Sequence, residues 1–246
     1  MQKNSFLFLT TAAVVLSSPV FAGTKVYSPN VVKSEFELEY RGNFNRDKDY
    51  DKDRAQKHKY AIGYGFTDYY ASEIYLIAEN SGQKSYETKE IEWANRFQLT
   101  EQGKNFADVG LYLSFVKSIG SEGHDEAEAK ILLEKQIGKF VNRINLGVEK
   151  ELRKVNNEKA GNGAELGVDW MTKYSYKKSF EPGFEYHVNF GNYADKHNGY
   201  RAQEHQVGPA FYGKIGNFKY DVGLLFGTSK VTVDRQIKWN LEYEFF

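Results

Sequence analysis

The chain has 246 residues, with 33 basic and 33 acidic side chains, no cysteine and a charged fraction of 27%. The lack of cysteine excludes a disulfide scaffold and a cysteine-ligated zinc or iron–sulfur site, and the zero net charge argues against nucleic acid as a partner. No run reaches the roughly 20 apolar residues that a membrane-spanning helix needs. The unusual feature is an aromatic share of 16% in an otherwise polar sequence.

Residues 1–22 have the pattern of a secretory signal peptide. Lys3 supplies a positive charge, an apolar stretch follows it, and residues 20–22 form a small-residue cleavage site. Pro19 argues against the alternative of a buried N-terminal helix. We therefore expect residues 1–22 to be removed on export and residues 23–246 to form a single domain.

After this segment, apolar residues recur at every second position, which is the period of a β-strand. The first run places Phe36, Leu38 and Tyr40 on one face and charged residues on the other. Twelve such runs follow one another, and the third is the weakest because Ile77 interrupts its polar face. They fall within residues 36–40, 60–66, 74–78, 91–99, 109–115, 129–137, 144–148, 166–174, 184–190, 207–215, 218–226 and 237–245.

The segments that link these runs alternate strictly between long and short. The long links are 43–57, 80–87, 117–126, 152–163, 192–204 and 228–235, and the short links are 67–70, 100–105, 138–139, 177–179 and 216–217. An up-and-down barrel with one elaborated rim and one tight rim produces this alternation. The sequence therefore predicts an all-β fold, a closed antiparallel up-and-down transmembrane β-barrel of about twelve strands.

The alternation alone leaves open whether the apolar face points inward, as in a soluble lipocalin-like barrel, or outward into lipid. Three features favour the outward orientation. A twelve-stranded lumen is hard to fill with apolar side chains, glycines concentrate on the polar face, where they make room for charged neighbours, and aromatic residues gather at the ends of the apolar faces, as in interfacial girdles. Asn95 and Lys135 are polar residues in the outward-facing register; Lys135 can extend to the interface from near a turn, whereas the pattern explains nothing about Asn95.

The last run resembles the C-terminal assembly signal of Gram-negative outer-membrane β-barrel proteins, which has the form polar-x-Gly-x-x-aromatic-x-aromatic. Lys238, Asn240, Tyr243 and Phe245 match it, followed by Phe246, with asparagine where glycine is usual and the in-phase aromatic at the penultimate position. The resemblance implies a porin-like barrel in the cell outer membrane with both termini in the periplasm. It also implies contact with outer-membrane lipids, lipopolysaccharide and the barrel assembly machinery. Twelve-stranded members include narrow solute channels, nucleoside channels and a phospholipase.

The polar register supplies the predicted lumen, with sixteen acidic and nine basic side chains. We interpret it as a narrow passive channel for small hydrophilic solutes with a mild cation preference, because the side-chain charge of a pore sets its ion preference. The alternative is a lumen closed by paired charges, with no conducting path. The candidate lumen-lining residues are Glu37, Glu39, Arg41, Glu92, Arg96, Asp108, Lys130, Glu134, Arg143, Glu149, Asp169, Lys173, Glu185, His187, Lys214, Asp221, Lys238 and Glu242.

One loop has the acidic spacing of a calcium site, with aspartates at positions 47, 49, 51 and 53. Calcium loops of this type need glycine at the sixth position and glutamate at the twelfth, which here are Lys52 and His58. We expect a solvated extracellular loop, bridged to lipopolysaccharide phosphates by divalent cations, and no protein metal site.

An outer-membrane lipid hydrolase or acyltransferase would need a histidine paired with a nucleophilic serine or threonine. Four of the five histidines lie in or beside long links, and His187 faces the lumen next to Glu185, where it could meet Ser114 only by chance of register. We therefore predict a non-enzyme without catalytic residues or a cofactor. The second hypothesis is a non-conducting surface barrel that acts in adhesion or partner binding through its loops, and a lipid enzyme is the third.

Overall fold

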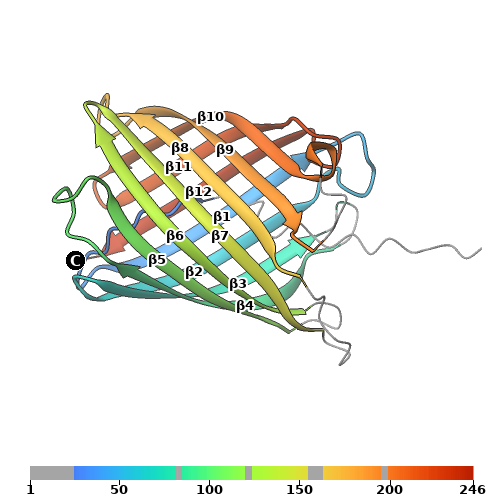
Figure 1. The fold of residues 1–246 in the computed structure, drawn as a ribbon, viewed down its shortest axis with the longest axis horizontal. Coiled ribbons are helices and arrows are strands. Elements are labelled where there is room, and N and C mark those ends of the chain that lie inside the picture. The colour runs from blue at the N-terminus through green and yellow to red at the C-terminus, as the bar shows by residue number, and fades with distance from the viewer. Residues whose placement is uncertain are drawn as a thin grey trace, which may run out of the picture.

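The computed structural model describes residues 25–80, 82, 85–119, 124–154, 163–194 and 199–245. These form a closed antiparallel barrel in which each strand pairs with its sequence neighbours and the last strand pairs with the first (Figure 1). The predicted all-β, twelve-stranded closed barrel is confirmed, whereas the signal peptide predicted at 1–22 lies outside the described residues. The strands are β1 (Phe36–Arg46), β2 (Gln56–Thr67), β3 (Tyr70–Asn80), β4 (Glu87–Gln98), β5 (Asp108–Ser118), β6 (His124–Ile137), β7 (Phe140–Lys154), β8 (Glu165–Tyr174), β9 (Glu181–Asn192), β10 (Glu204–Ile215), β11 (Phe218–Gly227) and β12 (Arg235–Phe245), with one 3-10 turn, Tyr200–Ala202.

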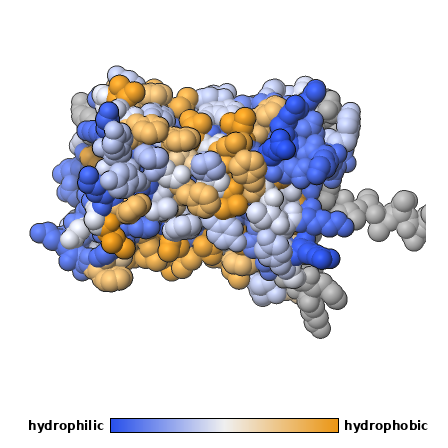
Figure 2. Space-filling view, turned by 90° about the horizontal axis from the view of Figure 1, so that it is seen from above, coloured by the Kyte–Doolittle hydropathy of each residue, from blue (hydrophilic) through white to orange (hydrophobic). Residues whose placement is uncertain are grey.

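The apolar faces of the strands point outward, as predicted. Leu38, Ile62 and Trp93 are 43%, 55% and 54% exposed, whereas the residues on either side of each along its strand are buried inside the barrel. Figure 2 shows apolar side chains gathered around the middle of the visible face and hydrophilic ones at both ends. Within the part of the chain that the structure describes, no helix is long and apolar enough to cross a membrane.

The links between strands form two rims. The tight-turn rim carries 68–69, 99–107, 138–139, 175–180 and 216–217. The described residues of the loop rim are 47–55, 82, 85–86, 119, 163–164, 193–194, 199–203 and 228–234. The expectation of a strict long–short alternation is wrong, because 99–107 on the tight-turn rim is longer than 119–123 on the loop rim. Strands such as β6 extend well beyond their apolar runs, and this extension shortens the links on the loop rim.

The outward-facing polar residues have local partners. Asn95 accepts a hydrogen bond from the hydroxyl of Tyr70 at 2.8 Å, so its side-chain oxygen is satisfied on the barrel surface. The ammonium of Lys135 lies 4.6 Å from the ring centroid of Phe106, near the tight-turn rim. Because an unpaired polar group is costly in an apolar environment, these contacts explain how both residues fit the outward-facing register.

Two apolar clusters lie inside the barrel, although the inward register is mainly polar. Each cluster contains one residue that precedes β1 in the chain: Tyr27 in the first and Val26 in the second. The inward position of Ile77, which weakened the third predicted run, is explained by the first cluster. The two clusters consist of Tyr27, Ala61, Tyr75, Ile77, Ala94, Tyr112 and Leu132, and of Val26, Met171, Ala210 and Tyr212.

A charge placed in the middle of the apolar belt should destabilise the barrel. Ile74 lies near the middle of β3 and pairs with Ile62 and Trp93 on the adjacent strands. Ile74→Arg should lower the free energy of unfolding by about 2–4 kcal/mol, whereas the same change at Ile137, beside the tight-turn rim, should cost roughly 0–1 kcal/mol. Urea unfolding in phospholipid vesicles measures both; equal losses would contradict the outward belt.

Candidate functional site: the charged lumen

The residues immediately before β1 enter the barrel, and residues 25–34 are termed the N-terminal segment. The backbone of Tyr27 is held by the side chain of Asn145 on β7, which accepts from the Tyr27 amide at 2.7 Å and donates to its carbonyl at 3.0 Å. The segment turns back into β1 at Ser34, whose φ of 64° lies in the left-handed region. The amide of Ser34 donates to the carbonyl of Gly65 at 2.7 Å, which fixes this reversal at the tight-turn rim.

Closer to the tight-turn rim, the N-terminal segment is held by side chains of β4 and β6. The hydroxyl of Ser28 and the side-chain amide of Asn30 donate to the two carboxylate oxygens of Glu134, at 3.0 and 3.2 Å. The backbone amide of Val31 donates to the side chain of Gln98 at 2.8 Å. Side chains of the barrel wall therefore bind several polar groups of a segment that forms no strand.

Some of the inward-facing glycines make room for this segment. A Cβ atom on Gly65 would lie 1.9 Å from the carbonyl oxygen of Val32, and one on Gly110 would lie 2.9 Å from Pro29. The sequence interpretation, in which glycines accommodate charged neighbours, fits Gly63, where the added atom would lie 3.0 Å from a glutamate side chain. The N-terminal segment is a second reason for the inward-facing glycines.

The innermost end of the segment reaches a cluster of carboxylates from β1 and β12. The ammonium of Lys25 lies 2.7 Å from Glu242 and 3.9 Å from Glu37, and it donates a hydrogen bond to Glu39. Arg41 binds the other oxygen of Glu39 through Nε at 2.9 Å and Nη2 at 2.5 Å. Every one of these side chains is buried, and the two cations offset part of the charge of the three carboxylates.

Aromatic hydroxyls connect this cluster to carboxylates on β3 and β4. The hydroxyl of Tyr75 donates to Glu73, which also accepts from Arg96 at 3.2 Å. Glu92 accepts from the hydroxyl of Tyr112 at 2.7 Å and from a lysine of β2 at 2.9 Å. Both carboxylates thus have a cationic and a phenolic partner.

The lumen holds a second network of charged side chains. Lys238 is fully buried and lies 2.7 Å from Glu185 and 2.9 Å from Asp221. His187 lies between two carboxylates, with its ring nitrogens 2.8 Å from Asp169 and 2.9 Å from Glu185. These contacts join β8, β9, β11 and β12 and keep the wall charges paired without the N-terminal segment.

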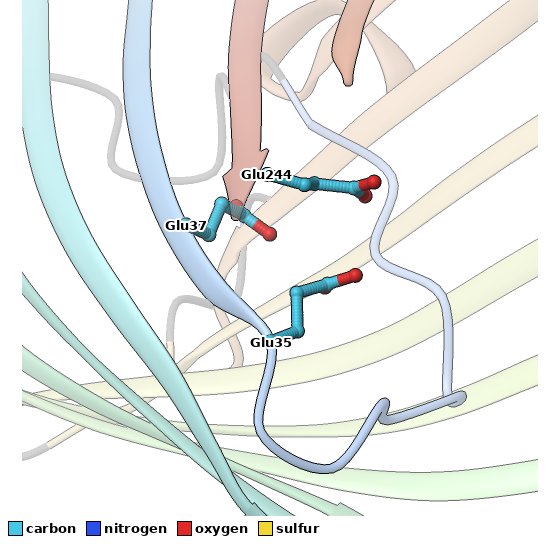
Figure 3. A group of neighbouring side chains, drawn as sticks. All are labelled: Glu35, Glu37 and Glu244. Carbon is cyan, nitrogen blue, oxygen red and sulfur yellow. The ribbon is translucent and has the colours of Figure 1, made fainter. Parts of the chain in front are cut away.

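A third acidic group lies nearer the tight-turn rim. Glu35, Glu37 and Glu244 offer carboxylate oxygens within 4.8 Å of one another, and Figure 3 shows them beside the coil of the N-terminal segment. Lys214 and Lys219 both form ion pairs with Glu244. The sequence interpretation named no metal site, and this group, with two lysines on one carboxylate, is part of the lumen's ion-pair network.

The structure places all eighteen sequence-predicted lumen residues on inward-facing positions of the strands. Twelve are buried and six are partly buried. The interpretation missed Lys25 and Tyr27, which precede the first apolar run and follow no strand period, and it missed the inward tyrosines at 75, 112 and 212. The partly buried residues are Arg96, Glu134, Arg143, Lys173, Lys214 and Asp221.

In the described part of the predicted assembly signal, the aromatic residues face outward and the polar residues face the lumen, as the pattern requires. Tyr243 and Phe245 are exposed on the outer surface of β12, and Lys238 and Asn240 are buried inside. Phe246 lies outside the described residues. Recognition by the assembly machinery stays a prediction.

The described histidines do not form a nucleophile–base pair. Both ring nitrogens of His187 face carboxylates, and the rings of His58 and His205 contact tyrosines. His124 lies 2.7 Å from Glu126. His197 lies outside the described residues. Since carboxylates and tyrosine hydroxyls lie against these four rings, the described residues offer no support for lipid hydrolysis.

In the acidic loop between β1 and β2, aspartate side chains accept hydrogen bonds from backbone amides of the same loop. Asp47 and Asp49 accept hydrogen bonds from the amides two residues ahead, at 2.7 and 3.1 Å, and Asp53 accepts from the amide of Asp47 at 3.1 Å. The other oxygen of Asp47 accepts from the amide of Asp234 at 2.9 Å. The aspartates thus stabilise turns, and the expected solvated loop agrees with this arrangement.

Comparison with known proteins shows what this chain resembles. No protein-family model and no curated protein sequence matches it. Among solved structures, the KdgM porin matches at 11% identity and a TM-score of 0.56, over 85% of this chain and 99% of that one. An outer membrane channel from Pseudomonas putida F1 matches at 9% and 0.60, over 87% and 96%, and the NanC porin at 8% and 0.56, over 85% and 99%.

The chain has the fold of an outer-membrane porin. At these identities the likeness shows the fold alone. Together with the apolar belt on the barrel surface, the fold places the chain in the outer membrane, as the resemblance of its last strand implies.

Substitution of the glycine that contacts the N-terminal segment should loosen the segment. Gly65→Ala would bring a Cβ within 1.9 Å of a backbone oxygen, whereas Gly63→Ala meets only a flexible side chain. Overpacking costs about 1–3 kcal/mol, so the segment should open more often by roughly tenfold. Because the chain has no cysteine, a Val26→Cys reporter can be labelled selectively with maleimide.

We expect faster labelling of this reporter with Gly65→Ala than with Gly63→Ala, which is the matched control two residues away on β2. Heat-modifiable gel mobility verifies that both barrels remain folded. Equal labelling rates would show that Gly65 does not hold the segment in place.

Proposed function

We propose that the protein is a narrow passive channel of the outer membrane for small hydrophilic solutes. The observation that carries this proposal is the N-terminal segment itself. An extended stretch of chain with its side chains lies within the wall of strands, so the space enclosed by the strands is wide enough for a small solute. Barrels of about eight strands are filled by their own wall side chains, and a twelve-stranded wall leaves more room.

The second part of the proposal is a mild cation preference. Carboxylates outnumber cations in the inward register. The innermost group, Glu37, Glu39 and Glu242, is paired with Lys25, and Arg41 also binds Glu39. A narrow pore lined by acidic side chains favours cations. The eighteen predicted lumen residues are the proposed pore lining.

The proposed partners follow from the surfaces. The apolar belt contacts outer-membrane lipids, the loop rim meets lipopolysaccharide, and the alternating aromatic face of β12 is read by the barrel assembly machinery. Tyr243 and Phe245, both exposed, would carry that recognition.

One observation favours the alternative of a non-conducting surface barrel. Val26 and Tyr27 pack into the two internal apolar clusters, so the middle of the lumen is filled in this state. A protein in which this filling is permanent would act through its loops, in adhesion or partner binding. Conductance separates the two functions.

Planar bilayers under a potassium chloride gradient test the channel. The protein lacking residues 1–22 should give discrete conductance steps, with a reversal potential displaced toward the potassium equilibrium potential. A reversal potential on the chloride side would contradict the cation preference, and silent bilayers with correctly folded protein would refute the channel.

Removal of a lumen arginine should change the pore. Arg96 pairs with Glu73 at 3.2 Å, and Arg143 pairs with Glu134 at 2.5 Å. In Arg96→Ala and Arg143→Ala the uncompensated carboxylate should alter conductance and move the reversal potential further toward potassium. The control, Arg201→Ala, removes an exposed arginine of the loop rim and should leave both unchanged. If both lumen variants conduct identically to the wild type, these arginines do not line the constriction.

A further inference from the structure

Three buried carboxylates at the seam of the barrel form a site of their own. Glu37 and Glu39 come from β1 and Glu242 from β12, and one oxygen of each lies within 4.8 Å of the others. Glu39 and Glu242 are direct partners across the two strands. Like charges opposite each other are unfavourable, and buried carboxylates need a cation, so this arrangement requires a positively charged group.

The structure contains such a group. The ammonium of Lys25 lies among all three carboxylates, 2.7 Å from Glu242 and 3.9 Å from Glu37 and within hydrogen-bond distance of Glu39. An ammonium carries three donors and no acceptor, which matches a set of three acidic acceptors. The position of Lys25 shows that the three carboxylates accommodate a primary ammonium group.

The chain that supplies this ammonium is separate from the wall. Lys25 belongs to the N-terminal segment, which is held by Asn145, Glu134 and Gln98 and forms no strand with any of the twelve. The ladder hydrogen bonds between strands, including those of β1 with β12, do not involve it. Its displacement would therefore leave every strand pair intact and would leave the three carboxylates without this cation.

We propose that Glu37, Glu39 and Glu242 form the binding site of the channel for the primary ammonium group of a solute, and that Lys25 is a built-in competitor for this site. The proposal rests on the proposed channel function. A solute with an ammonium on a short aliphatic chain reproduces the Lys25 side chain and takes its place. Solutes of this class thus both bind in the lumen and release the segment that fills it.

A divalent metal ion fits the site less well. Calcium takes six to eight oxygen ligands, and the guanidinium of Arg41 already binds Glu39 at 2.5 and 2.9 Å. The side-chain amide of Asn240 donates to the same oxygen of Glu242 that faces Lys25, at 2.6 Å. A fixed positive charge next to the carboxylates favours a singly charged occupant.

The test uses the full mature chain and n-butylammonium, whose four carbons and ammonium copy a lysine side chain. Lys25→Ala vacates the site, so the protein in detergent should bind n-butylammonium on the order of tenfold more tightly than the wild type, in which Lys25 competes. Lys25→Arg keeps a cation in the site and should behave as the wild type. Isothermal titration measures binding, with 1-butanol as the uncharged control ligand.

Two double variants locate the bound ammonium. Lys25→Ala with Glu242→Gln should lose the binding, whereas Lys25→Ala with Glu165→Gln, which removes a carboxylate near the loop rim, should keep it. Heat-modifiable gel mobility verifies that each barrel is folded. Equal binding in the two double variants would overturn the assignment to this cluster.

The outcomes separate this site from the channel function. Conductance of Lys25→Ala without n-butylammonium binding overturns the site and leaves the channel. Binding in silent bilayers supports the site and refutes the channel. Binding of calcium with no binding of n-butylammonium overturns the ammonium chemistry.

Discussion

The pairing of β1 with β12 is the interaction on which the rest of this molecule depends. In hydrocarbon every backbone amide and carbonyl must be paired within the protein, and strands achieve this only by closing into a barrel. The register of closure places Glu37 opposite Glu244 and Glu39 opposite Glu242. The β1–β12 seam satisfies the backbone hydrogen bonds. It also places four carboxylates along two adjacent strands, where they face the lumen and repel one another.

Cations from four different places compensate these carboxylates. Lys214 of β10 and Lys219 of β11 pair with Glu244, and Arg41 of β1 itself pairs with Glu39. The remaining demand is met by Lys25, which lies outside the sheet. Removing one partner of a buried ion pair is strongly unfavourable, because the other charge is left uncompensated. The inward position of the N-terminal segment thus follows from the composition of the seam.

The fold could be predicted from the sequence because its signals are local and periodic. Phe36, Leu38 and Tyr40 define the lipid-facing side of β1 without knowledge of any other strand, and the same holds for the other eleven runs. The polar register could be predicted for the same reason. The contacts that fill the lumen could not, because they depend on register between strands and on a segment with no period.

The missed residues show where such prediction ends. Nothing in the spacing of Lys25 and Tyr27 distinguishes them from an ordinary linker between an export signal and a strand. The available signals were indirect: glycines at 65 and 110 that no charged neighbour requires, and apolar residues such as Ile77 in a polar register. Both features indicate an additional occupant of the lumen, which is too wide for wall side chains alone to fill. That occupant forms no strand with the wall, so the pairing of the twelve strands does not depend on it, whereas the compensation of the carboxylates at the seam does.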